Sequence, residues 1–99
     1  MYNVSISPRI SKDINKHLDF LAKVSIKAAE RLEKDFAEKI ATLCETPTSN
    51  QILVFKGENT MYRKLFVPKR YLILYEIEGN NVFVDYVVDC RQDYSWLLQ

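Results

Sequence analysis

Basic residues in the second half of the chain are the first candidates for chemistry, because arginine and lysine are the side chains that hold phosphate. Five of them lie between positions 56 and 70, where Glu58 is the single acid. They are Lys56, Arg63, Lys64, Lys69 and Arg70. From position 71 onward the balance reverses, since Arg91 is the one basic residue among five acids. We therefore expect any anion-binding site to be local rather than to extend over a basic face.

The residue types available limit the reaction that such a site could perform. An arginine guanidinium can grip a phosphate with two hydrogen bonds and stabilise developing negative charge, but it stays protonated and cannot act as a base. A lysine with a lowered pKa, or a tyrosine, can transfer protons. Cys44 and Cys90 are too few and too far apart for a zinc cluster, so we expect two buried, reduced thiols, no metal and no cofactor.

Two amphipathic helices are predicted in the first half of the chain. Ser7 followed by Pro8 is a typical helix start, and apolar residues then recur at helical spacing from Ile10 to Leu21. Ser25 is positioned to cap a second helix, whose apolar stripe runs to Leu43. Thr46-Pro47-Thr48-Ser49-Asn50 ends it, so the two helices form an antiparallel hairpin with one apolar face to cover.

Strand-like runs surround this hairpin. Residues 2–6 alternate weakly, and four further runs cover residues 51–56, 61–67, 70–78 and 82–90. Residues 92–99 are predicted to form a short final helix. The expected fold class is α+β, in a single domain spanning residues 1–99. It has an N-terminal strand and an antiparallel helical hairpin packed on a mainly antiparallel four-stranded sheet, in the order β-α-α-β-β-β.

Alternation along the strands predicts which side chains face the helices. Tyr71, Ile73, Tyr75 and Ile77 form the more apolar set of their strand, and Val82, Val84, Tyr86, Val88 and Cys90 match them in the next. The opposite, open face would then carry Leu72, Leu74, Glu76, Phe83, Asp85, Val87, Asp89 and Arg91. The run from Met61 to Val67 divides ambiguously. An apolar open face predicts a covering partner.

Several segments in order carry a family resemblance. They are the Ser-Pro helix start, LCETP at residues 43–47, YRKL at 62–65, RYLILYEI at 70–77 and VVDCRQDY at 87–94. The set resembles the RelE/ParE superfamily of toxins from type II toxin–antitoxin (plasmid stabilisation) modules. The resemblance covers nearly the whole chain. It implies growth inhibition when the toxin is free, and a cognate antitoxin that wraps it with an amphipathic, acidic segment.

Some members of the superfamily cut messenger RNA on the ribosome without a metal. The resemblance to them implies a candidate RNA-cleavage site in this chain. Arg63 and Arg91 fall where those nucleases carry basic residues, which places Arg63 on the open face. Lys64 and Tyr94 would assist. Leu72 departs from the pattern, because the nucleases usually have arginine at that position. The competing interpretation is that Arg63 and Arg91 only pair with Glu76 or Asp85 at the surface.

Three functions therefore stay open at the level of sequence. The first is ribosome-dependent messenger RNA cleavage, the second is ParE-like poisoning of DNA gyrase without a nuclease site, and the third is an attenuated relic that binds antitoxin only. The loss of a central cation favours the second or an unknown target. No apolar run approaches the length of a membrane span, so we expect no membrane association and a cytoplasmic protein.

Overall fold

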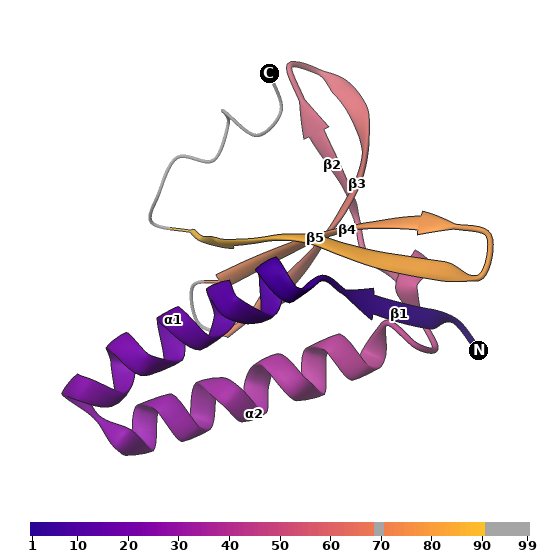
Figure 1. Cartoon of the computed structure of the whole chain (residues 1–99). Coiled ribbons are helices and arrows are strands. Elements are labelled where there is room, and N and C mark those ends of the chain that lie inside the picture. Colours follow the sequence, from indigo (N-terminus) through magenta and orange to yellow (C-terminus); the bar gives the residue numbers. More distant parts are fainter. Residues whose placement is uncertain (69–70, 91–99) are drawn as a thin grey trace.

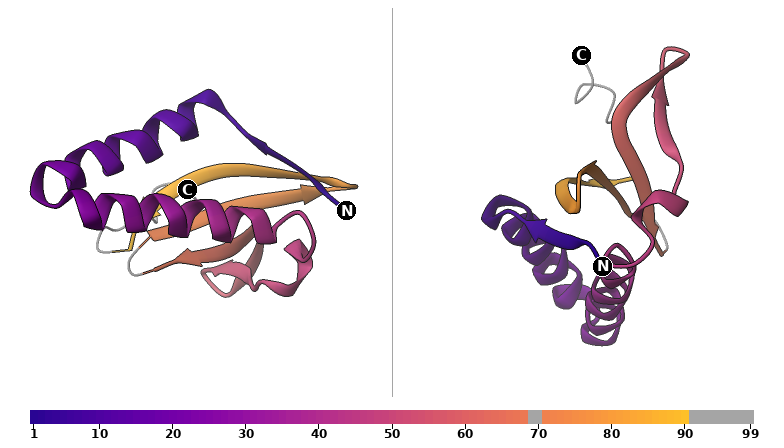
Figure 2. Two further views of the ribbon diagram at one scale, coloured as in Figure 1. Left: turned by 90° about the horizontal axis from the view of Figure 1, so that it is seen from below. Right: turned by 90° about the vertical axis from the view of Figure 1, so that its right-hand side faces the viewer.

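The computed structural model describes residues 1–68 and 71–90 of the 99-residue chain. Its elements are β1 (Asn3–Ile6), α1 (Pro8–Val24), α2 (Ile26–Thr42), a 3₁₀ turn η1 (Pro47–Ser49), β2 (Ile52–Phe55), β3 (Glu58–Val67), β4 (Tyr71–Glu78) and β5 (Asn81–Asp89). Both helices lie on the same side of the sheet, as Figures 1 and 2 show. The predicted α+β fold class is confirmed. The predicted final helix at residues 92–99 lies outside the described residues.

The two helices begin where the sequence predicts, because serine side chains cap them. The Ser7 hydroxyl accepts a hydrogen bond from the Ile10 amide at 3.3 Å, and Pro8 occupies the first helical position. The Ser25 hydroxyl accepts from the Ala28 amide at 3.2 Å. Ser25 is the only residue between α1 and α2, so the chain reverses there and the helices pack side by side.

The sheet has five strands rather than the four predicted. Their order is β1-β5-β4-β3-β2, and every neighbouring pair is antiparallel except β1 and β5. β1 runs parallel to β5 and pairs Asn3 with Asn81. The two outermost strands are four residues each, and both join the sheet along one edge only. The β2–β3 hairpin projects away from the helices (Figure 1).

The main core fills the space between the helices and one face of the sheet. Side chains from α1, α2 and the strands meet there, and Ile73, Tyr75 and Val82 are fully buried. Tyr71 packs against Phe36 and His17, with ring centroids 5.4 Å and 5.0 Å apart. The prediction that Tyr71, Ile73 and Tyr75 face the helices is confirmed.

A β-bulge at Asp85 changes the alternation of β5. Tyr75 pairs with Val84, but Leu74 pairs with Tyr86, so Asp85 has no partner across the β4–β5 ladder. An extra residue reverses which side of the sheet the following side chains face. Tyr86 and Val88 therefore point away from the helices, and Val87 packs against the main core. The prediction for these three residues was wrong because regular alternation does not hold through a bulge.

A second, smaller core occupies the face opposite the helices. Leu72 and Leu74 are almost completely buried there beside Leu53, and Tyr62, Tyr86 and Val88 pack around them. Leu72 and Leu74 were expected to lie on an open surface. That expectation was wrong, since the β2–β3 hairpin contributes Leu53 and Tyr62 to cover them.

Candidate functional site

Arg63 lies on the helix side of the sheet, not on the opposite face where the resemblance placed it. It pairs across the ladder with Tyr75, whose side chain is in the main core. Its guanidinium Nη1 donates to the carbonyl oxygens of Asn50 at 2.7 Å and Thr48 at 3.3 Å. These bonds commit the guanidinium to the loop before β2. A catalytic role for Arg63 stays a prediction, but its observed contacts are structural.

Arg63 belongs to a polar network that fixes the loop at residues 47–50. The Tyr75 hydroxyl donates to the Pro47 carbonyl and accepts from Asn50 Nδ2 at 3.0 Å. Burial raises the pKa of Tyr75, and the hydrogen bond from Asn50 and the charge of Arg63 partly oppose that rise. A buried phenol with both a donor and an acceptor partner is a satisfied structural group rather than a proton-transfer group.

Of the other three nominated residues, the structure describes Lys64. Lys64 pairs across the ladder with Leu74, so it belongs to the face opposite the helices. Arg91 and Tyr94 lie outside the described residues, and their proposed roles stay predictions. Leu72, which stands where the nucleases usually have arginine, is 1% exposed. The four nominated residues are therefore not seen together as a site in the described part of the chain.

A polar cluster forms instead at the bulge. Alternation placed Glu76 and Asp85 on the same face, but it did not predict the bulge or their contact. Asp85 and Glu76 carry carboxyl groups within hydrogen-bonding reach of each other, and the Asp85 Oδ2 atom is buried without another partner among the described residues. Burial and the Glu76 carboxyl raise the pKa of Asp85 to about 7, and Arg9 opposes the rise. A carboxylate only accepts hydrogen bonds, so these two groups hydrogen-bond only when one is protonated.

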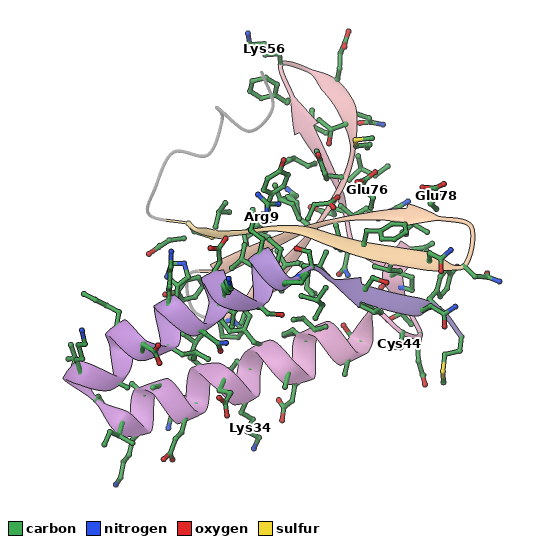
Figure 3. All side chains as sticks on the ribbon, in the orientation of Figure 1. Arg9, Lys34, Cys44, Lys56, Glu76 and Glu78 are labelled. Carbon is green, nitrogen blue, oxygen red and sulfur yellow. The ribbon has the colours of Figure 1, made fainter. Side chains whose placement is uncertain are left out.

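Arg9 connects this cluster to the start of α1. Its Nη2 donates to the Asp85 carbonyl oxygen at 3.0 Å, and its guanidinium lies 5.4 Å from the ring centroid of Tyr86. β1 ends opposite Val84, so the Asp85 carbonyl lies just beyond that pairing. In Figure 3, Arg9 extends from the first turn of α1 toward β5. The cluster thus ties a helix end to the bulged strand.

Tyr62 completes the cluster without being prepared for proton transfer. Its ring lies edge-on to Tyr86 at 5.9 Å between centroids. Burial, then the neighbouring Tyr86, Asp85 and Glu76, raise the pKa of Tyr62 above its ordinary value of 10.0. A raised pKa keeps the phenol protonated at neutral pH, whereas a general base requires a lowered one. The sequence signal for this cluster was weak, because nothing local marks Asp85 as a bulge.

Three further features of the described residues concern metal binding, the cysteines and membrane crossing. No group of three or more His, Cys, Asp or Glu side chains there could hold a metal ion. Cys44 is half-buried, but Cys90 is exposed, so the prediction of two buried thiols was wrong for Cys90. The helices in this part of the chain are too short or too polar to cross a membrane.

Comparison with known proteins supplies the family. The model of the family described as ParE toxin of type II toxin-antitoxin system, parDE, matches residues 4–94. Among solved structures, a chain from "Chromosomal ParDE TA system from P. aeruginosa" superposes with a TM-score of 0.73 at 13% sequence identity, covering 90% of this chain and 96% of the other. At that identity the superposition supports the fold alone. A search of curated proteins finds no match.

The family model spans nearly the whole chain, from β1 past the end of β5, and includes the helical hairpin and every strand of the sheet. The superfamily resemblance drawn from the sequence is therefore confirmed. The chain belongs to the ParE toxin family of type II toxin–antitoxin systems.

Proposed function

We propose that this chain is a toxin that arrests bacterial growth by a route other than RNA cleavage, with DNA gyrase as its target. The observation that carries the proposal is the placement of Arg63. Its guanidinium Nη1 donates to the Thr48 and Asn50 carbonyls on the helix side of the sheet, which favours a target other than a nucleic acid bound to the opposite face. Membership of the ParE family favours the same target.

The electrostatics of the opposite face support this choice. Messenger RNA cleavage requires the enzyme to stabilise extra negative charge on a phosphate, which demands cations near the reacting group. That face carries Glu76 and Asp85, and the pKa of Asp85 is raised to about 7 partly by its acidic neighbour. An RNA phosphate placed there would meet like charge. Leu72 supplies no cation either, since it is apolar and buried.

Ribosome-dependent messenger RNA cleavage is the second candidate, because Lys64 belongs to the face opposite the helices. In that alternative Arg91 would grip the phosphate and Tyr94 or Lys64 would move a proton. In either case we propose a cognate antitoxin as the partner that neutralises the toxin.

Controlled expression in a bacterial host distinguishes the two routes. We expect growth arrest with induction of the DNA-damage response and without new messenger RNA 5′-ends inside codons. Purified chain should also inhibit supercoiling by gyrase. New ends inside codons without DNA damage would establish the nuclease instead. Normal growth despite soluble expression would contradict both routes in that host.

Matched substitutions sharpen this test. Arg63→Ala should reduce the amount of folded protein but leave the arrest per folded molecule unchanged, because its contacts are internal. Arg91→Ala removes the remaining nominated arginine. If Arg91→Ala abolishes both arrest and RNA cleavage at equal soluble expression, the gyrase proposal is wrong.

A further inference from the structure

β3 is longer than the strand that covers its outer edge. The β2–β3 pairing ends at Ile52 opposite Arg63, after which the Lys64 amide donates to the Gln51 carbonyl at 2.9 Å. β3 continues to Val67, and within the described residues that last part pairs with β4 alone. Among residues 1–68 and 71–90, nothing therefore pairs with the outer edge from residue 65 to residue 67.

The open edge offers both kinds of backbone hydrogen-bonding group. In an antiparallel ladder the N–H and C=O of one residue point to the same side, and successive residues point to opposite sides. Because the Lys64 amide points away from β4, the N–H and C=O of Phe66 point to the open edge as well. The Phe66 side chain is 58% exposed beside them. One residue of an added strand could bond both backbone groups.

The loop that precedes β2 does not extend the pairing along this edge. Residues 47–50 precede β2 and turn aside, fastened by Tyr75 and Arg63 through the hydrogen bonds described above. A hollow of about 280 Å³ remains between this loop, α2 and β3. By holding residues 47–50 in place, the hydrogen bonds around Arg63 and Tyr75 keep this loop off the edge of β3.

The hollow is basic. Lys39 from α2 and Lys64 from β3 line it, together with Ser49, Asn50 and Gln51, and in the part of the chain that the structure describes no carboxylate does. Lys39 approaches from the helix side, whereas Lys64 belongs to the opposite face of the sheet. In residues 1–68 and 71–90 neither lysine forms an ion pair. An occupant complementary to the hollow would carry acidic groups on both sides of its backbone.

We propose that this edge receives an extended, acidic peptide segment of a partner protein as an added strand beside β3. Two consecutive acidic residues in an extended chain point to opposite faces, so one meets Lys39 and the next meets Lys64. A nucleic acid fits less well, because phosphates only accept hydrogen bonds and would leave the Phe66 carbonyl facing negative charge. Identifying the partner as the antitoxin rests on the proposed function above.

A peptide titration of the purified full-length chain tests the proposal. The probe is a blocked hexapeptide with two consecutive glutamates at its centre and valines on either side. We expect binding at millimolar peptide that shifts the amide signal of Phe66 in heteronuclear NMR spectra and slows its hydrogen exchange. Replacing both glutamates with glutamine, or N-methylating the peptide backbone on its bonding edge, should weaken binding by at least about tenfold.

Substitutions in the chain locate the contact. Lys39→Gln and Lys64→Gln should each weaken peptide binding by about three- to tenfold. Lys34→Gln is the matched control on α2, because Lys34 is exposed and pairs with Glu38 at 3.8 Å away from the hollow. Its binding should be unchanged. An equal loss in all three variants would show a non-specific charge effect and overturn the proposal.

Two further outcomes contradict the proposal. The first is absence of binding, or binding that leaves the Phe66 amide unshifted. The second is preference for a single-stranded oligonucleotide of equal charge with the same lysine dependence, which would make the hollow a phosphate site. Growth arrest is scored separately. If the chain does not arrest growth, the proposed function fails while the titration stands; if the titration fails in a chain that arrests growth, only this inference fails.

Discussion

The two faces of the sheet differ in how their polar groups are satisfied, although the same strands build both. On the helix side, the hydroxyl of the buried Tyr75 has both a donor and an acceptor partner, and Arg63 donates hydrogen bonds to two backbone carbonyls. On the opposite side, the carboxyls of Glu76 and Asp85 lie close together, and the buried Asp85 Oδ2 has no hydrogen-bond donor among the described residues. The polar groups of the first face are satisfied by hydrogen bonds, whereas the second face keeps two acidic side chains next to each other.

β5 contributes to both faces because of its bulge. Val82 and Val84 belong to the main core, whereas Tyr86 and Val88 belong to the small core opposite. A single residue without a ladder partner, Asp85, thus divides one strand between a large core and a small one. Four experiments, in decreasing order of the expected change in stability, probe the two faces separately.

Adjacent residues on β4 provide the most direct comparison. Ile73→Ala should lower the free energy of unfolding by about 4 kcal/mol, since Ile73 is 0% exposed in the large, well-packed core. Leu74→Ala should cost about 2 kcal/mol, because the small core contains partly exposed residues that can collapse into the cavity. Denaturant unfolding of both variants measures the difference. Equal losses would show that the two cores are equally rigid.

Tyr75→Phe tests the satisfied network on the helix side. Removing the hydroxyl leaves the Pro47 carbonyl and Asn50 Nδ2 without their partner, so we expect a loss of about 2 kcal/mol in unfolding free energy. Tyr71→Phe is a comparison on the same strand and face. A loss below about 0.5 kcal/mol for Tyr75→Phe would mean that water replaces the hydroxyl.

Arg63→Ala separates structural from catalytic roles. It removes two hydrogen bonds to carbonyl oxygens at a half-buried position, and we expect a loss of about 1.5 kcal/mol in stability. Arg63→Lys should recover part of the loss, because an ammonium can donate to these carbonyls but lacks the planar, forked geometry of the guanidinium. Thermal unfolding provides the measurement. A fully stable Arg63→Ala variant with lost toxicity would restore the catalytic assignment.

The acidic face predicts an unusual pH dependence. The folded chain holds a proton on Asp85 up to pH about 7, whereas in the unfolded chain the group loses it near the ordinary value of 3.8. The free energy of unfolding should therefore fall as pH rises from about 4 to about 7, because the unfolded state binds fewer protons there. Asp85 is partly exposed, so solvent screening limits the total to about 1–2 kcal/mol.

Asp85→Asn keeps the shape of the side chain and removes the titration. It should stabilise the chain by about 1 kcal/mol at pH 8 and flatten the dependence of unfolding free energy on pH. Glu78→Gln changes an exposed acid on β4, the strand that carries Glu76, and serves as the control that should leave the slope intact. An unchanged slope in Asp85→Asn would mean that the two carboxyls do not share a proton.

Local patterns were sufficient for the elements and for most of the main core. The capping serines, helical spacing and strand-like runs are short-range signals, and the structure has helices and strands where they predicted. The position of Tyr71, Ile73 and Tyr75 against the helices also followed from alternation alone. The ordered motifs were enough to name the superfamily, which the family model confirms.

The face on which a side chain lies, and the residues that gather around it, could be found only from the three-dimensional structure. The face of Arg63 depends on which residues of β3 and β4 pair, and that register has no local signature. The cluster around Asp85 depends on the bulge and on Arg9, which is 76 residues away along the chain. The open edge of β3 depends on where β2 stops, because pairing length is a property of two strands together.

Local spacing and ordered motifs were enough to predict the α+β class, the helical hairpin, the strand-like runs and the superfamily. Three features appear only in the folded chain. Arg63 donates to the Asn50 carbonyl, the carboxyls of Glu76 and Asp85 lie close together, and Lys39 and Lys64 border a strand edge that is open among the described residues. The physical reason is that these features arise from contacts between distant segments, whose register and twist are set when the whole sheet packs.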